Sequence, residues 1–239
     1  MLQIDNICAY YMCLPVALGV TIALMLWYIY HTRMRRTDSM VTDSPAMLML
    51  KDYGQRLLVY VRKHQANQYT EGAARQQMTR ARHNNLKNIE TMDGKMLILL
   101  SRYNPSTIYE VTRGADGSTS TTYDKGRSMD MCLKDVNGEV HDDNLIKFVF
   151  THELAHIMTY ENDHPDVFWM NFKFLLEVAV DNGLYIPYDF SSKPVQYCGM
   201  MVNHSPLYDQ TIPSLFTQYV NVKCGGSYKN CGKNNQILY

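Results

Sequence analysis

Hydrophobic and polar positions follow different periods in successive parts of the chain, and each period predicts a different kind of element. Residues 7–30 are uncharged and largely apolar, which predicts a helix long enough to cross a bilayer. Apolar side chains then recur at helical spacing after Ser44 and Pro45, a pair typical of a helix start. A second helical stretch is predicted over residues 71–89.

The middle of the chain has the alternation and the β-branched content of short strands. The segments with these features are residues 96–100, 107–112 and 128–133. Turn signals follow the second and the third of them, at residues 114–117 and at Asn137-Gly138. We therefore expect a small sheet in this part of the chain.

Helical periodicity returns in the last third of the chain. Asp142, Asp143 and Asn144 are candidate N-cap residues for one helix. Pro165 predicts the start of another, with Phe168 among the apolar residues on one face. The order of helices, small sheet and helices predicts an α+β fold.

The uncharged run at 7–30 determines the predicted location of the protein. A cleaved signal peptide would need a basic start and a small-residue cleavage site, and the sequence has neither. Arg33, Arg35 and Arg36 follow the run, so the positive-inside rule places that side in the cytosol. We expect a single-pass membrane protein with its amino terminus outside and a lipid bilayer as the partner of residues 7–30.

These patterns divide the 239 residues into four predicted parts. They are an anchor with a basic flank at 1–36, a linker at 37–45, a folded domain at 46–219 and a polar, flexible tail at 220–239. The folded domain is long enough to bury a hydrophobic core. An apolar fraction of 46% also argues against a disordered chain.

The balance of charge argues against a general nucleic-acid binder, because 23 basic residues are matched by 23 acidic ones. Residues 51–95 carry a local basic excess. We interpret it as a solvated helix surface, with contact to nucleic acid or anionic lipid as the weaker alternative.

The six cysteines include no C-x-x-C pair and so do not predict a zinc ribbon. In a reducing cytosol we expect free thiols rather than a disulfide framework. Cys224 and Cys231 flank a glycine-rich stretch and could pair if the topology were reversed.

The segment with the most specific chemistry contains the pattern H-E-x-x-H, as His152, Glu153 and His156. Residues four apart share a helix face with Cβ atoms about 5–6 Å apart, so the two imidazoles can bind one Zn²⁺ ion. Glu153 projects to the side and can reach a water molecule at the metal. A pattern with so few fixed positions also occurs by chance, so further ligands are needed to support it.

Catalytic zinc needs a third protein ligand and an open position. His164, eight residues after His156, is the candidate. His164 precedes Pro165, so the start of the next helix can direct the His164 imidazole toward the metal. The alternative is that His164 is only a residue at the helix boundary and does not bind the metal. Glu161 and Asp163 are weaker oxygen candidates, more typical of exposed loop charges or of partners that orient an imidazole.

The arrangement resembles that of the WLM-type zinc metallopeptidases, which are relatives of the SprT-like proteases. The similarity rests on residues 152–156 and on His164 followed four residues later by Phe168. A looser similarity extends through residues 172–176 and 194–199, as in WLM-like proteins of large cytoplasmic DNA viruses.

The resemblance implies a zincin-like metallopeptidase domain, with residues 128–133 where the family has its edge strand. It also implies a viral protein, in a host or virion membrane. The gap before His164 is longer than usual and lacks the family's glycine. The amino-terminal run is unlike the nuclear DNA-repair members, so DNA–protein crosslinks are not implied as substrates.

We predict a membrane-anchored zinc metalloendopeptidase. Zn²⁺ would be held by His152, His156 and His164, and Glu153 would take a proton from the attacking water. An extended peptide could pair with the strand at 128–133. Candidates for an oxyanion donor, each with a structural role as its alternative, are Tyr197, His204 and Tyr208.

The alternative is a catalytically inactive, membrane-anchored zinc-binding scaffold, or a viral structural or interaction protein. Structural zinc sites have four protein ligands, so a fourth ligand such as Cys198 or His204 would favour it. A weaker alternative is nucleic-acid binding beside a membrane through residues 51–95.

Overall fold

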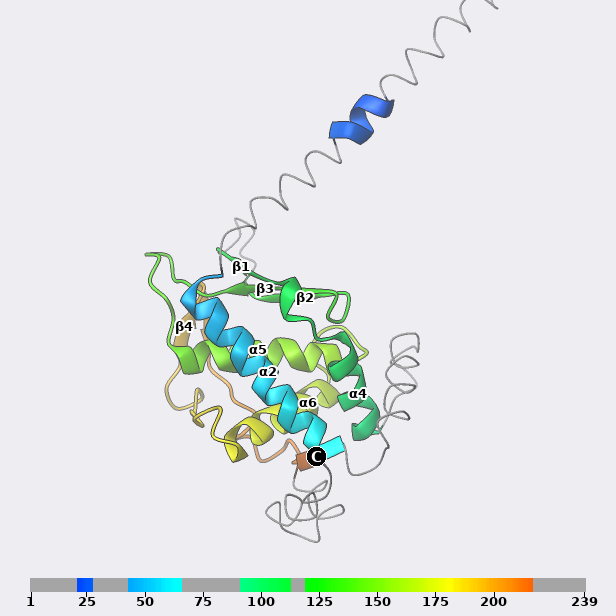
Figure 1. Cartoon of the computed structure of the whole chain (residues 1–239). Helices are drawn as coiled ribbons and strands as arrows, with labels where there is room; N and C mark the ends of the chain where they lie inside the picture. The colour runs from blue at the N-terminus through cyan, green and yellow to red at the C-terminus, as the bar shows by residue number, and fades with distance from the viewer. Residues whose placement is uncertain (1–20, 28–42, 66–90, 113–118, 217–239) are drawn as a thin grey trace, which may run out of the picture. The chain divides into compact units, whose positions relative to one another are not determined.

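The computed structural model describes residues 21–27, 43–65, 91–112 and 119–216. The chain divides into two compact units, Met1–Asp43 and Ser44–Tyr239, and the larger one combines helices with two small sheets (Figure 1). Several predictions concern segments outside the described residues, namely those for 71–89, 114–117, 220–239 and most of the basic stretch at 51–95.

The described part of the first unit is a helical segment at residues 21–27. Such a segment rises about 10 Å, against roughly 30 Å of hydrocarbon in a bilayer. No helix within the described ranges is long and apolar enough to span a membrane. The predicted transmembrane helix at 7–30 is therefore wrong, and so is the single-pass membrane localisation that rested on it. Residues 7–20 and 28–30 of that run lie outside the described residues.

The first helix of the larger unit confirms the predicted helix start at Ser44 and Pro45. Helix α2 spans Pro45–Gln65, and the Ser44 hydroxyl accepts a hydrogen bond from the Met47 amide at 3.2 Å. Met47 and Leu50 on its apolar face are buried in the core.

The apolar run at 96–100 is helical, so the strand predicted there is wrong. It lies within helix α4 (Met92–Arg102), whose first turn is capped by Thr91, which accepts a hydrogen bond from the Gly94 amide at 3.2 Å. Residues 96–99 are all buried. A run that is apolar at every position has no period that separates a buried helix from a strand.

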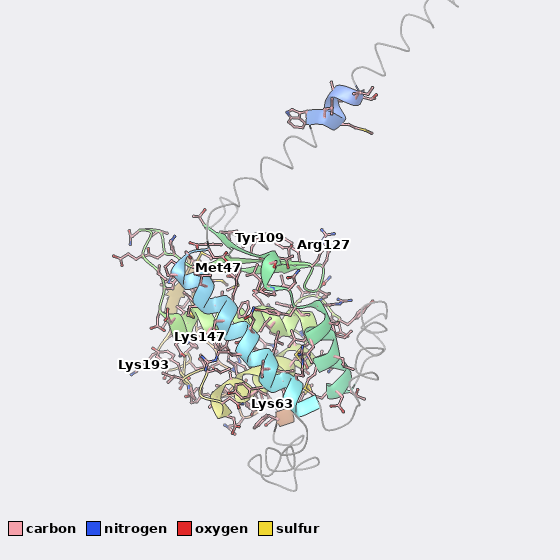
Figure 2. The ribbon with its side chains drawn as sticks, viewed as in Figure 1. Met47, Lys63, Tyr109, Arg127, Lys147 and Lys193 are labelled. Carbon is pink, nitrogen blue, oxygen red and sulfur yellow. A yellow bond between two sulfur atoms is a disulfide. The ribbon has the colours of Figure 1, made fainter. Side chains whose placement is uncertain are left out.

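A three-stranded sheet follows, in the order β1-β3-β2. Its strands are β1 (Ile108–Val111), β2 (Thr121–Tyr123) and β3 (Ser128–Cys132). β1 runs parallel to β3 and β2 runs antiparallel to it. β1 and β3 confirm two predicted strands, but β3 is central, so its predicted place at the sheet edge is wrong. The edge strands are β1 and β2. Figure 2 shows Tyr109 of β1 at the sheet.

Two long helices form the centre of the domain: α5 (Asp143–Met158) and α6 (Asp166–Asp181). They pack against each other, and α5 also contacts α2, α4 and β2 (Figure 1). Asp142 caps α5, as its position predicts, because its carboxylate accepts hydrogen bonds from the amides of Asn144 and Leu145. Helix α5 is therefore packed against neighbouring elements on several sides.

A second, two-stranded antiparallel sheet consists of β4 (Val195–Tyr197) and β5 (Met200–Val202). A disulfide between Cys132 at the end of β3 and Cys198 in the β4–β5 turn joins the two sheets. Both cysteines are buried. The prediction of free thiols is therefore wrong for this pair. The other four cysteines lie outside the described residues.

Candidate metal centre

Helix α5 places the two histidines of the motif on one face. The Nε2 atoms of His152 and His156 lie 3.2 Å apart. His164, in the loop before α6, completes the group, with its Nε2 atom 3.0 Å from that of His152. The structure thus brings together the three residues that the sequence predicts as metal ligands.

The two distances from His152 Nε2, of 3.2 Å to His156 and 3.0 Å to His164, are close to the separation that a shared metal ion requires. Imidazole nitrogens bound to tetrahedral Zn²⁺ at about 2.0–2.1 Å lie about 3.3 Å from one another. The ligand atoms of the three histidines all lie within 4.8 Å of one another, and no fourth His, Cys, Asp or Glu of the described segments joins them. Three ligands with an open side are typical of a catalytic metal site.

The ring of Phe168 contacts all three imidazoles. Its centroid lies 4.8 Å from that of His152 and 4.5 Å from those of His156 and His164. Phe168 is fully buried in the first turn of α6, so it restricts the orientation of each imidazole. Sequence reasoning placed Phe168 on an apolar helix face and used its position four residues after His164 in the family resemblance, but it did not predict this contact with the imidazoles.

Burial keeps the imidazoles neutral. Desolvation lowers the pKa of His152 to about 3 and that of His156 to about 4, and repulsion from neighbouring imidazolium charge acts in the same direction. Desolvation also lowers the pKa of His164. A neutral imidazole has a free lone pair, which is the form that binds a metal ion. The site is therefore ready for a metal at neutral pH.

Glu153 is buried, with 4% of the residue exposed. Burial raises the pKa of its carboxyl to about 7, although hydrogen bonds from Thr122 lower it. The Thr122 hydroxyl lies 2.8 Å from Glu153 Oε2 and 3.1 Å from the Glu153 carbonyl oxygen. A pKa near neutrality suits a group that accepts and returns a proton. Sequence reasoning missed Thr122.

The triad and Glu153 line a cavity of about 700 Å³. Residues 119–122, in and before β2, form one wall, and residues 200–204, in and after β5, form another. Side chains alternate between the two faces of a strand, so consecutive lining residues indicate that the edge of β2 faces the cavity. The site is therefore open to a ligand that runs along β2.

The three candidate oxyanion donors lie in different surroundings. The Tyr197 hydroxyl hydrogen-bonds to the Ser120 hydroxyl at 2.6 Å and donates to the Cys132 carbonyl, so it holds β4 against the first sheet. Tyr208 is 44% exposed and is not a lining residue of the cavity. His204 lines the cavity and remains a candidate.

The residues suggested as further metal ligands stay outside the triad. Cys198 has no thiolate to offer because it is disulfide-bonded. The Nε2 atom of His204 lies 3.7 Å from Asp209 Oδ2. Glu161 and Asp163 are exposed loop residues.

Comparison with known proteins identifies a viral relative and no family. Over 109 residues the chain is 37% identical to an uncharacterized protein of Acanthamoeba polyphaga mimivirus. The match covers 45% of this chain and 54% of the relative, so the chain spans about half of the relative's length. No protein-family model and no solved structure matches the chain.

Proposed function

We propose that the chain is a zinc-dependent metallopeptidase that cleaves extended protein segments. The observation that supports this most directly is the convergence of three neutral imidazoles beside a buried carboxylate in an open cavity. His152, His156 and His164 would hold Zn²⁺, and Glu153 would act as the general base and acid. The resemblance of the motif to the WLM-type metallopeptidases supports the same chemistry.

A bound Zn²⁺ ion supplies Lewis-acid polarisation of the scissile carbonyl and of a water molecule. The chain itself supplies the proton transfers. Thr122 holds Oε2 of Glu153, so Oε1 takes the proton of the attacking water and passes it to the leaving amine. In the metal-free chain the carboxyl pKa of Glu153 is about 7, which is the range that suits a group that takes up and returns a proton near neutral pH. Tyr197 and His204 both line the cavity, but the Tyr197 hydroxyl donates its proton to the Cys132 carbonyl oxygen, so His204 is the candidate donor to the oxyanion.

The cavity favours an extended peptide as substrate. Within the described residues β2 pairs with β3 on one side only, and residues 119–122, in and before β2, line the cavity in succession. A peptide added as a further strand beside β2 would pass Glu153, because Thr122 of this strand contacts that carboxylate. Folded proteins present few unpaired segments, so we expect cleavage of denatured or flexible protein.

Zinc content and proteolysis, measured on the same purified chain, test this proposal. The wild type should bind one equivalent of zinc and cleave a denatured, fluorescently labelled protein. Glu153→Gln should retain the zinc but lose cleavage by about 100-fold or more. The matched control is Glu139→Gln, at an exposed glutamate before α5, which should cleave like the wild type.

Two results would contradict the proposal. Equal cleavage by Glu153→Gln would remove the general base from the mechanism. Zinc binding by the wild type without cleavage of any denatured protein would favour an inactive zinc-binding scaffold. If the proposal holds, the Glu153→Gln variant also retains bound substrate, which mass spectrometry can identify.

A further inference from the structure

The loop that carries His164 has little to hold it in place. Residues 160–164 are all exposed. Asp163, directly before His164, has a φ of 61°, a left-handed conformation that few residues other than glycine adopt readily. A metal ligand on such a loop needs an anchor if it is to stay beside its two partners on α5.

That anchor comes from Lys125, in the turn between β2 and β3. Its ammonium group donates a hydrogen bond to the Glu161 carbonyl oxygen at 2.7 Å. Among the described residues, no other hydrogen bond links the backbone of residues 160–164 to a different part of the chain. Lys125 also lines the cavity, as His164 does.

The turn that presents Lys125 is itself firmly placed. The amides of Gly126 and Arg127 donate hydrogen bonds to the Tyr123 carbonyl oxygen, at 3.1 and 3.0 Å, and so close the turn. Arg102 of α4 donates a hydrogen bond to the Lys125 carbonyl at 3.3 Å. Gly126 packs against α5 so closely that an added Cβ would lie 3.0 Å from Ile157 Cδ1. The ammonium group therefore extends from a fixed point.

We propose that Lys125 is a positioning residue for the third metal ligand: it ties the loop at 160–164 to the β2–β3 hairpin and so keeps His164 beside His152 and His156. This inference rests on the proposed zinc site. Thr122 of the same hairpin holds Glu153, so one hairpin positions both the general base and the third ligand.

The ammonium charge of Lys125 and its hydrogen bond to the loop predict opposite effects on zinc affinity when Lys125 is replaced. The ammonium charge lies near enough to lower the pKa of His156, so it also repels a bound cation. If charge alone mattered, Lys125→Met would bind zinc more tightly than the wild type. If Lys125 positions the loop, the same substitution weakens binding because His164 is released.

The test compares zinc affinity, by competition with a chromogenic chelator, and the visible spectrum of the Co²⁺-substituted protein. Lys125→Met should bind zinc about 10- to 100-fold more weakly, as expected for loss of a group that orients a metal ligand. Its Co²⁺ spectrum should shift toward that of His164→Ala. Lys125→Arg should restore binding, since a guanidinium can also donate to the Glu161 carbonyl. Lys193→Met, at an exposed lysine, is the matched control and should equal the wild type.

Unchanged or tighter zinc binding by Lys125→Met would overturn the inference while leaving the proposed function intact. The inference also fails if the metal-free Lys125→Met protein melts at a lower temperature in proportion to its loss of affinity, because the effect would then be general destabilisation. Absence of zinc binding by the wild type would instead overturn the proposed function.

Discussion

The Thr122 hydroxyl group lies 2.8 Å from Glu153 Oε2 and joins edge strand β2 to the carboxylate of the metal centre. It is also 3.1 Å from the Glu153 carbonyl oxygen, so it contacts both the side chain and the backbone of this residue. Because β2 is the strand beside which we expect substrate to bind, this contact links substrate position to the proposed general base.

Replacing Thr122 by valine should reduce cleavage while leaving zinc content unchanged. The hydrogen bond stabilises the carboxylate, so its loss raises the pKa of Glu153 further above its ordinary value. Less of the ionised base is then present at neutral pH, and the acid limb of the pH–rate profile moves to higher pH. A hydrogen bond to a charged group contributes about 1.5–3 kcal/mol, which corresponds to about one to two pKa units, so we expect kcat at pH 7 to fall by about 5- to 100-fold. The control is Thr107→Val, at a threonine outside the cavity whose hydroxyl donates to the Asn104 carbonyl oxygen, and an acid limb that stays in place in Thr122→Val would contradict this assignment.

Zinc should be retained well below pH 6.5. Protons compete with a metal for imidazole only when the pH approaches the pKa of the metal-free site. Burial lowers the pKa of His152 to about 3 and that of His156 to about 4, so both remain neutral at pH 5. Dialysis of the loaded protein between pH 7.5 and pH 5, followed by metal analysis, measures this. The comparison is a synthetic peptide of residues 148–168, which carries all three histidines without the folded domain that buries them. Complete zinc loss from the protein by pH 6 would contradict the prediction.

The cluster of three histidines could be predicted from the sequence because its spacing is local. His152 and His156 share a helix face through one helical turn, and Asp142 marks where that helix begins. His164 is close in sequence and lies just before the next helix. Short-range geometry of this kind depends little on the rest of the fold.

The parts that could not be predicted depend on contacts between distant segments. Thr122 belongs to a three-residue strand that gives almost no periodic signal, and its partner lies 31 residues away in the sequence. Cys132 and Cys198 are 66 residues apart, and nothing in their flanking sequence pairs them. The strand at 128–133 was correct as an element, but its central position depends on which other strands pair with it.

Removing the disulfide should loosen the cavity wall formed by residues 200–204. The disulfide connects the β4–β5 turn to β3. Because it constrains the unfolded chain, a native disulfide typically contributes about 2–5 kcal/mol to the free energy of unfolding. We expect the Cys132→Ala, Cys198→Ala double variant to lose about that much free energy of unfolding in denaturant titrations and to show a raised KM. Dithiothreitol should reproduce the effect in the wild type and leave the double variant unchanged. Equal stability with and without the disulfide would contradict the prediction.

Phe168 should affect zinc binding beyond its contribution to stability, because its ring touches all three imidazoles. Phe172 is equally buried but among the triad contacts only His152, at a ring-centroid distance of 5.3 Å. Phe168→Leu and Phe172→Leu each remove one buried aromatic ring from α6, so we expect similar losses in the free energy of unfolding of the metal-free protein.

The zinc affinities of these two variants should differ. A leucine at 168 leaves the imidazoles free to rotate, and loss of such support costs about tenfold or more in affinity. Phe172→Leu should bind zinc nearly as tightly as the wild type. Chelator competition measures the affinities, and thermal unfolding of the metal-free proteins gives the stability comparison. If both variants lose zinc affinity equally, the ring of Phe168 contributes to core packing and has no specific effect on the metal site. If only Phe168→Leu loses zinc affinity, a buried ring in the first turn of α6 also sets the geometry of the metal site.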